Sequence, residues 1–424
     1  MSSVLRRLGT IALSATIALV AFAATAAAGI AHSSQSSTSK VAGTPSAHQP
    51  IPRSAKARFT VAVVLGQSGS DAADVLAPYE VLASSPDFAV YTIAASTKPA
   101  ALDGGMAVDP DYTFADVASG AAPAPDLIVV PAVNLPDGPE EQAARDFVVE
   151  RYGAGARILG ICAGSRLLSA TGILNGLTAT SHWSRIAALE KSNPEVSWIR
   201  GQRYVQDGRV TTTGGVTSSI SGALKVMADM VGSAEAKRVG GEIAYPGWTL
   251  SSTTRIPKAS FGLADAAVLL NTAFPWGRPS FTIELTDGVG EIDASALFEV
   301  YSYSQSALTR AVSSTGSVRT KHGLMLRTEL KRDAGGQTLV AGDLESSSGF
   351  GGLDAAFEQL GRSVSPALVV SVGKMLEYPL DRVTRASSQT TDQWRAPALL
   401  GLAVLLAAGL GTLPLLARRL RRRK

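Results

Sequence analysis

The chain of 424 residues has a single cysteine, Cys162, and only four histidines. One cysteine excludes a disulfide framework and any cysteine-rich zinc site. Four histidines leave little for a histidine-based metal cage. Aromatic residues are few, at 6%, but apolar residues make up 46%, which is enough to bury a core. We therefore expect a folded protein that uses neither a metal nor an organic cofactor.

Acidic residues are missing from both ends of the chain. Arg6 and Arg7 lie near the start, and six of the last seven residues are basic. Without these eight residues, the rest of the chain has 31 basic against 35 acidic residues. The net charge of +4 therefore comes from the ends, and the sequence predicts no nucleic-acid partner.

Two long runs contain no charged residue. Residues 8–31 form a run of 24 positions and residues 396–417 a run of 22. A bilayer core needs roughly 20 apolar residues in a helix, so both runs are long enough to span it. The basic clusters at their outer ends predict a cell-membrane protein with extracytoplasmic domains and a cytoplasmic C-terminal tail. The first run ends in small residues, so it is equally typical of a cleaved signal peptide.

Between these runs, buried strands alternate with helical patterns. Residues 59–65 (FTVAVVL) and 126–131 (DLIVVP) are short, β-branched apolar segments typical of strands buried on both faces. Helical patterns cover residues 71–84 and 140–152. This alternation predicts βαβ units, with a parallel sheet between two layers of helices.

The sequence Gly160-Ile-Cys162-Ala-Gly164 follows the predicted strand 157–161. A nucleophile between two glycines, after a strand and before a helix, is the arrangement of a nucleophile elbow. The start of the helix is expected to lower the thiol pKa, and the Ala163 N–H to face a developing oxyanion. An inert, buried cysteine in a strand-to-helix turn is the alternative.

Five ordered segments carry a resemblance to a known family: residues 74–81 (DVLAPYEV), the elbow at Cys162, residues 172–176, residues 179–183 and residues 207–215. In these segments the chain resembles the ThiJ/PfpI superfamily, which has a class I glutamine amidotransferase-like fold. The most similar branch holds isonitrile hydratases and the amidase-like domains of AraC-type regulators. The resemblance implies a flavodoxin-like α/β sandwich, frequently a homodimer, with an acidic residue against the elbow cysteine. Asp74 occupies that acidic position.

The chain also departs from this branch. Ala163 stands where the branch has Thr or Ser, and isonitrile hydration is therefore disfavoured. The strand that usually ends in Pro-Gly-Gly ends here in Pro131-Ala132-Val133, so the second oxyanion donor is absent or less accessible. His182 is the only imidazole of this domain and the candidate base for Cys162. A structural histidine beside Trp183 is the alternative.

Residues 281–379 repeat features of the first domain. Asp293-x-x-Ala-x-Phe-Glu-Val mirrors Asp74-x-x-Ala-x-Tyr-Glu-Val, and Gly336–Gly342 lies 128 positions beyond Gly208–Gly214. Earlier in the segment, Ser314-Thr315 lies 218 positions beyond Ser96-Thr97. The offset between matching residues therefore falls by 90, which corresponds to the part of the first domain that holds Cys162 and His182. We therefore expect a truncated second copy without the elbow, and a general βαβ likeness is the alternative.

These observations divide the chain into eight segments: a membrane segment or signal peptide (1–31), a tether (32–58), the ThiJ/PfpI-like domain (59–250), a linker (251–280), the partial repeat (281–380), a linker (381–395), a transmembrane helix (396–417) and a basic tail (418–424).

Two functions remain open from the sequence alone. The first is a cysteine-dependent amidase-like hydrolase or lyase acting on a small molecule at the outer side of the membrane. The second is a sensory or scaffold module that binds a small ligand without turnover. The candidate residues are the same for both: Cys162, Asp74 and His182, with Ala163, Ala132 and Val133 around the pocket.

Overall fold

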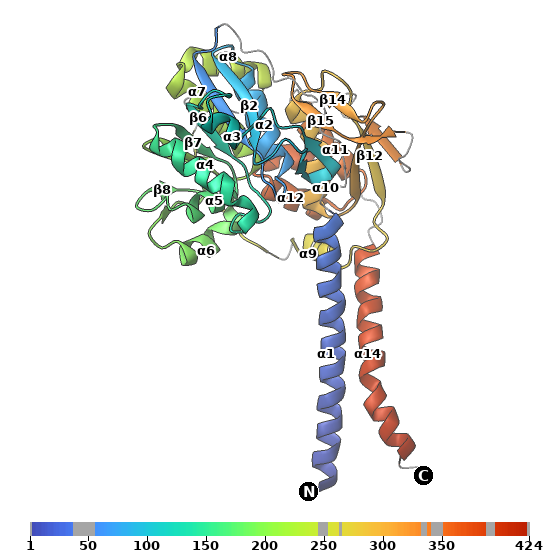
Figure 1. Cartoon of the computed structure of the whole chain (residues 1–424). Coiled ribbons are helices and arrows are strands. Elements are labelled where there is room, and N and C mark those ends of the chain that lie inside the picture. Colours follow the sequence, from blue (N-terminus) through green and yellow to red (C-terminus); the bar gives the residue numbers. More distant parts are fainter. Residues whose placement is uncertain are drawn as a thin grey trace.

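The computed structural model describes residues 2–36, 56–244, 253–262, 265–331, 337–340, 351–386 and 395–421. Most of the predicted tether 32–58 lies outside these residues, as do residues 387–394 and 422–424. Figure 1 shows an α/β body from which two long helices extend side by side, α1 (Ser2–Ser36) and α14 (Arg395–Arg421).

A sheet of seven strands forms the centre of the first unit. Its order is β10-β11-β7-β6-β1-β2-β5, and every neighbouring pair is parallel except β10 with β11. The strands are β1 (Phe59–Val64), β2 (Phe88–Ala94), β5 (Tyr112–Thr113), β6 (Leu127–Val130), β7 (Arg157–Gly160), β10 (Tyr204–Asp207) and β11 (Val210–Thr213). This is the predicted flavodoxin-like arrangement, and the predicted strand bounds are correct to within a residue.

Alternate residues of β1 enter two different cores. Val61 and Val63 belong to the core beneath α2 (Ala72–Ala83) and α7 (Val216–Met230), while Ala62 and Val64 belong to the opposite one. Successive side chains of a strand point to opposite faces, so an apolar run such as FTVAVV supplies both cores. The remaining helices of this unit are α3 (Phe114–Ala118), α4 (Gln142–Gly153), α5 (Gly164–Ala170), α6 (Trp183–Ser192) and α8 (Ser233–Ile243).

Two small sheets complete the first unit. The hairpin β3 (Ala100–Leu102) and β4 (Met106–Val108) encloses the turn η1 (Asp103–Gly105). Strands β8 (Thr178–Ala179) and β9 (Ser197–Trp198) pair in parallel, and η2 (Pro139–Glu141) precedes α4.

The second unit has a parallel sheet of its own, in the order β16-β13-β12-β17. Its elements are α9 (Ala266–Ala273), β12 (Ser280–Glu284), α10 (Glu291–Ser304), β13 (Leu308–Ser313), β14 (Ser317–Arg319), β15 (Met325–Arg327), β16 (Glu329–Leu330), β17 (Gln337–Val340), α11 (Gly351–Gly361), α12 (Pro366–Met375) and α13 (Leu380–Ala386). Part of the predicted repeat, Gly336 and residues 341–350, lies outside the described residues.

The two units meet through α2 and α10, which pack against each other. The Ala73 N–H donates to Glu299 Oε1 at 3.0 Å, and the Ile292 N–H donates to Glu80 Oε2 at 2.7 Å. Each helix thus receives a glutamate from the other at its first turn. Strands β4 and β15 also pair, which joins one hairpin of each unit into a four-stranded antiparallel sheet.

The two terminal helices differ in apolar length. Within α1, Thr10–Ser33 is long and apolar enough to cross a membrane. Within α14, the apolar part among the described residues is Ala398–Pro414, which is shorter, and Pro414 lies inside the helix. Thr10–Ser33 is therefore the only candidate span of this length among the described residues, and the transmembrane helix predicted over 396–417 is not confirmed.

Candidate functional site

Cys162 stands at a tight turn between β7 and α5. Its φ of 53° lies in the left-handed region, which is unusual for a residue with a side chain. Gly164 permits the turn, because a Cβ at that position would lie 2.2 Å from the carbonyl oxygen of Val130. Strand, turn and helix therefore follow one another in the order that a nucleophile elbow requires.

Hydroxyl groups hold the backbone of Cys162 on both sides. Its N–H donates to Thr213 Oγ1 at 3.3 Å. Its carbonyl accepts hydrogen bonds from Ser165 Oγ at 3.2 Å and from Ser181 Oγ at 3.1 Å. These side chains come from the end of β11, from α5 and from the segment after β8, so the turn depends on three separate elements.

Asp74 lies in the first turn of α2 and faces the elbow. Its Oδ2 accepts the Ala132 N–H at 3.1 Å, whereas its Oδ1 is buried without a well-aligned hydrogen-bond partner among the described residues. Burial raises the pKa of Asp74 well above its usual value, and the charge of Asp71 raises it further. Hydrogen bonds from the Ala132 amide and with the Cys162 side chain act in the opposite direction. The thiol therefore lies close enough to interact with this carboxyl.

The thiol itself is held in its neutral form. Cys162 is 3% exposed, and burial raises its pKa well above the usual value, helped by the charges of Asp74 and Asp71. A hydrogen bond from the Ala163 N–H lowers the pKa, but by less. The low thiol pKa expected from the helix start is therefore wrong for this state of the protein. Desolvation and two neighbouring carboxyls outweigh the dipole of a seven-residue helix.

Of the residues predicted around the oxyanion, Ala132 and Val133 are engaged elsewhere. The Ala132 N–H binds Asp74, and the Ala132 carbonyl accepts the Asp71 N–H at 3.0 Å. Val133 is buried and forms a β-bridge with Ser70. This agrees with the expectation that the second donor is less accessible here than in a glycine pair. The Ala163 N–H, in contrast, donates a hydrogen bond to the Cys162 sulfur.

His182 is buried at the start of α6, and both of its ring nitrogens have partners other than the thiol. Nδ1 lies 2.7 Å from Ser184 Oγ, and Nε2 lies 2.8 Å from the Met375 carbonyl oxygen. Burial lowers the pKa of His182 to about 4, so the ring is neutral at ordinary pH. The histidine therefore links the first unit to the end of α12.

The second unit supplies residues to this site that the sequence did not single out. Tyr303 of α10 donates its hydroxyl to Asp71 Oδ2 at 3.3 Å, and Glu299 accepts the Ala73 N–H. Burial, with the charge of Asp71, raises the pKa of Glu299 well above its usual value. The predicted repeat aligns Glu299 with Glu80, and this alignment could have identified Glu299 as a candidate residue. No sequence signal pointed to Tyr303.

Glu377, on the turn after α12, also belongs to the second unit and lies near the site. It has a φ of 53° and accepts a hydrogen bond from Ser218 Oγ at 2.6 Å. It packs so closely on Gly214 that a Cβ there would lie 2.4 Å from Glu377 Oε2. Burial raises the pKa of Glu377 to about 7.

Carboxyl groups therefore surround the thiol. Burial raises the pKa of Asp71. Burial together with the charge of Asp71 raises the pKa of Asp74 and of Glu299, and that of Asp103 to about 8. Neighbouring buried carboxyls cannot all ionise together, so several of them hold protons at neutral pH. Such a site disfavours anionic ligands.

Comparisons with known proteins show which family the first unit resembles. A model of the DJ-1/PfpI family matches residues 60–229. The isonitrile hydratase of Pseudomonas putida is 33% identical over 175 residues, which cover 41% of this chain and 72% of that protein. The HTH-type transcriptional regulator GlxA of Rhizobium meliloti (strain 1021) is 26% identical over 172 residues, and the chain spans 52% of its length.

Solved structures with a similar fold include DJ-1beta of Drosophila melanogaster. It has a TM-score of 0.39 and 20% identity, over 44% of this chain and 97% of that one. A ThiJ/PfpI family protein from Pseudomonas syringae has a TM-score of 0.39 and 24% identity, over 51% of this chain and 89% of that one. The residues that the family model matches include Asp74, Cys162 and His182 and end before the second unit.

Proposed function

This chain belongs to the DJ-1/PfpI family, and from that membership we propose that it is a membrane-anchored enzyme in which Cys162 attacks a small neutral substrate. The observation that carries the proposal is the pairing at the elbow. A cysteine with a left-handed φ lies beside a buried carboxyl whose Oδ1 has no well-aligned partner among the described residues. A strained nucleophile next to a buried base is an arrangement suited to covalent catalysis.

Asp74 is the proposed proton carrier. A carboxylate with a raised pKa is a stronger base than an ordinary one, so it can accept the thiol proton when an electrophilic carbon binds. The S–C bond forms while that proton passes to Asp74, which then returns it to the substrate nitrogen. With an amide, the C–N bond then breaks and ammonia leaves a thioester, whereas with a nitrile the nitrogen stays on the carbon as a thioimidate. Water next adds to that carbon and the S–C bond breaks, so that the product leaves and one proton of the water restores the thiol.

The substrate class follows from the charge of the site. An amide, nitrile or similar carbon–nitrogen group is neutral and enters the acidic surroundings without repulsion. The Ala163 N–H is the donor nearest to the developing charge, since the Ala132 N–H is occupied by Asp74. The role we propose for His182 is positioning, because its ring joins α6 to Met375 of the second unit.

A binding or sensory module is the second candidate. The observation that favours it is the closed state of the site, in which Cys162 is 3% exposed and its pKa is raised. In that case the carboxyl cluster binds a small neutral or cationic ligand without turnover.

Turnover by the full chain in detergent separates these functions. We expect hydrolysis or hydration of one member of a panel of primary amides, nitriles and isonitriles, followed by nuclear magnetic resonance. Cys162→Ser and Asp74→Asn should each lower the rate by at least about 100-fold. Asp137→Asn, at an acid with a 71% exposed side chain, is the matched control and should be unaffected. Turnover that survives Cys162→Ser would exclude the proposed nucleophile.

The second unit is, in this proposal, a truncated copy of the first that takes the place of a partner subunit. Glu299 and Glu80 stand 219 positions apart, as do Ile292 and Ala73, and the two hydrogen bonds between them are reciprocal. Reciprocal contacts of this kind characterise a two-fold interface between like subunits. The same face of α2 is then unavailable for a homodimer.

The proposed location is the outer side of the cell membrane. α1 and α14 lie side by side and both leave the body in the same direction. Basic residues flank both apolar runs, and the positive-inside rule then puts the body outside the cytoplasm.

A further inference from the structure

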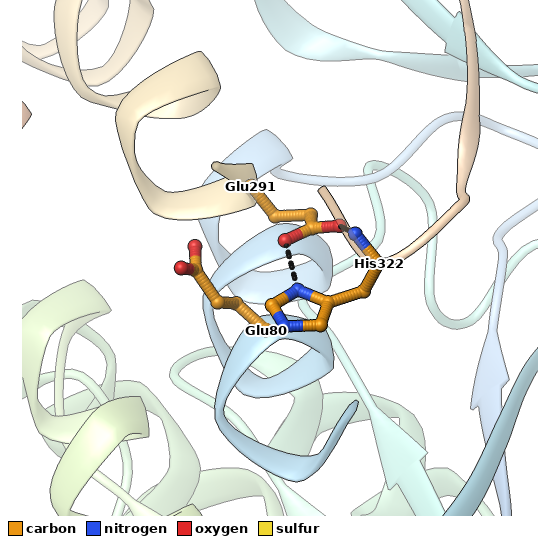
Figure 2. Close-up of side chains that lie close together, drawn as sticks. All are labelled: Glu80, Glu291 and His322. Atoms are coloured by element: carbon orange, nitrogen blue, oxygen red, sulfur yellow. Dashed lines mark hydrogen bonds and ion pairs between the residues drawn. The ribbon is translucent and has the colours of Figure 1, made fainter. Parts of the chain in front are cut away.

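Glu80, Glu291 and His322 form a second cluster of ionisable side chains, at the contact between the two units (Figure 2). They come from α2, from the first residue of α10 and from the turn between β14 and β15. One ligand atom of each lies within 4.8 Å of the others. Glu291 is fully buried and Glu80 is 8% exposed.

The ring of His322 lies between Ser84 and Glu291. Ser84 Oγ donates its single hydrogen to the Glu80 carbonyl at 2.8 Å. Ser84 Oγ also lies 3.3 Å from His322 Nε2. On the other side of the ring, Nδ1 lies 2.8 Å from Glu291 Oε2, so an imidazole nitrogen and a buried carboxylate face each other.

Two buried carboxyl groups and one imidazole therefore converge at one place. Glu291 is held in position through its other oxygen, because Oε1 accepts the Thr320 hydroxyl at 2.5 Å and the His322 N–H at 3.0 Å. On the other side, Glu80 Oε2 accepts the Ile292 N–H. Lys321 Nζ lies 3.9 Å from Glu80 Oε1, and the Lys321 side chain is 57% exposed.

We propose that Glu80, Glu291 and His322 bind one divalent transition-metal ion such as Zn²⁺ or Mn²⁺. One imidazole nitrogen and two carboxylate oxygens suit these ions better than Mg²⁺ or Ca²⁺. Ligand atoms at about 2.1 Å from an ion lie roughly 3.0–3.4 Å apart, so His322 Nδ1 and Glu291 Oε2 need to separate only slightly. Ser84, Thr320 and the Ile292 amide orient the ligands through their other atoms, as outer-shell partners do in metal sites.

The ion would fasten the two units together. Glu80 belongs to the first unit, and Glu291 and His322 to the second. The three ligands converge only while α10 is docked on α2, so metal binding stabilises the docked arrangement. The site is separate from the carboxyls around Cys162 and does not depend on the proposed enzymatic function.

Calorimetric titration of the full chain in detergent, freed of metal by a chelator, tests this directly. The titrated protein carries Cys162→Ser, which removes the thiol as a competing ligand. We expect one equivalent of Zn²⁺ to bind and to raise the midpoint of thermal unfolding. His322→Asn and Glu80→Gln should each weaken binding by at least about 10-fold. His32→Gln removes an exposed histidine in α1 and should change nothing.

X-ray absorption on the zinc-loaded chain without the Cys162→Ser change adds an independent readout. Nitrogen and oxygen neighbours at about 2.0–2.2 Å are expected, whereas sulfur at about 2.3 Å would identify Cys162 as the ligand instead. Absence of binding, or equal affinity in His322→Asn, would also overturn the proposal. If His322→Asn does not fold, Glu80→Gln decides, because its amide oxygen can still accept the Ile292 N–H.

Discussion

Cys162 and Asp74 are a pair in which each ionised group opposes ionisation of the other. The charge of Asp74 raises the pKa of the thiol, and burial raises the pKa of both groups. A buried pair of this kind shares its protons, so the carboxylate forms first and the thiolate only at higher pH. In the proposed mechanism, the thiol therefore stays neutral until a substrate binds and the thiol proton passes to Asp74.

Asp74→Asn should therefore lower the pKa of Cys162. The change removes a negative charge beside the sulfur, and we expect a shift of at least about one unit, or about 1.4 kcal/mol. The ultraviolet absorbance of the thiolate, followed against pH, measures it, since Cys162 is the only cysteine. Asp137→Asn is the control. A rise of the thiol pKa would mean that Asp74 donates a hydrogen bond to the thiolate.

His182 should make the protein less stable in acid. Its pKa is about 4 in the folded state and 6.5 as a free side chain. A group with a depressed pKa of this kind takes up its proton first in the unfolded chain, so stability falls as pH drops from about 6.5 towards 4. The total is about 3 kcal/mol. His182→Gln keeps a donor for the Met375 carbonyl but does not titrate.

Thermal unfolding at several pH values tests this expectation. The midpoint of His182→Gln should rise relative to that of the unmodified chain as the pH falls below about 6.5. Glu377 has the opposite dependence, since its pKa is raised to about 7, but it is present in both proteins and cancels in the comparison. Parallel midpoints over this range would show that His182 does not titrate as described.

At the scale of elements, the contact between α2 and α10 depends on buried acceptors. Each helix begins with N–H groups that have no partner within the helix. Glu299 and Glu80 satisfy one such N–H on the opposite helix. The two units are therefore joined by backbone groups as well as by apolar side chains.

Glu299→Ala should destabilise the chain by about 1–3 kcal/mol, because it leaves the buried Ala73 N–H unsatisfied. Glu299→Gln retains an acceptor oxygen and removes repulsion with Asp71, so it should be neutral or stabilising. Thermal unfolding of the two variants compares them directly. Equal destabilisation by both would show that the charge of Glu299, rather than its acceptor oxygen, stabilises the contact.

For the whole molecule, the covered face of α2 predicts a monomer. α10 occupies this face, and in our proposal it takes the place of an identical subunit. Light scattering of the full chain in detergent, corrected for bound detergent, should give the mass of one chain. A dimer would show that another surface, or the paired terminal helices, mediates association.

The orientation in the membrane is a separate prediction. Cys162 is too buried to report on it, so a cysteine is placed at exposed Ser192 in α6, with Cys162→Ala in the same chain. A membrane-impermeant thiol reagent should label Ser192→Cys in intact cells as fully as after solubilisation. Labelling only after solubilisation would place the body on the cytoplasmic side.

The local pattern of the sequence determined the sheet, the helices on its faces and the turn at Cys162. An apolar, β-branched run such as 59–64 has few alternatives to a buried strand, and glycines on both sides of Cys162 permit a left-handed turn. The position of Asp74 beside Cys162 was also predictable, because residues at the carboxyl ends of parallel strands meet at one edge of the sheet.

The tertiary structure decided the chemistry of that turn. The pKa of Cys162 depends on burial and on carboxyls from distant parts of the chain, which no local pattern contains. Tyr303, Glu299 and Glu377 enter the site only because the second unit docks on the first. The same docking brings Glu80 to His322, 242 positions away, so only the assembled units reveal the proposed metal site.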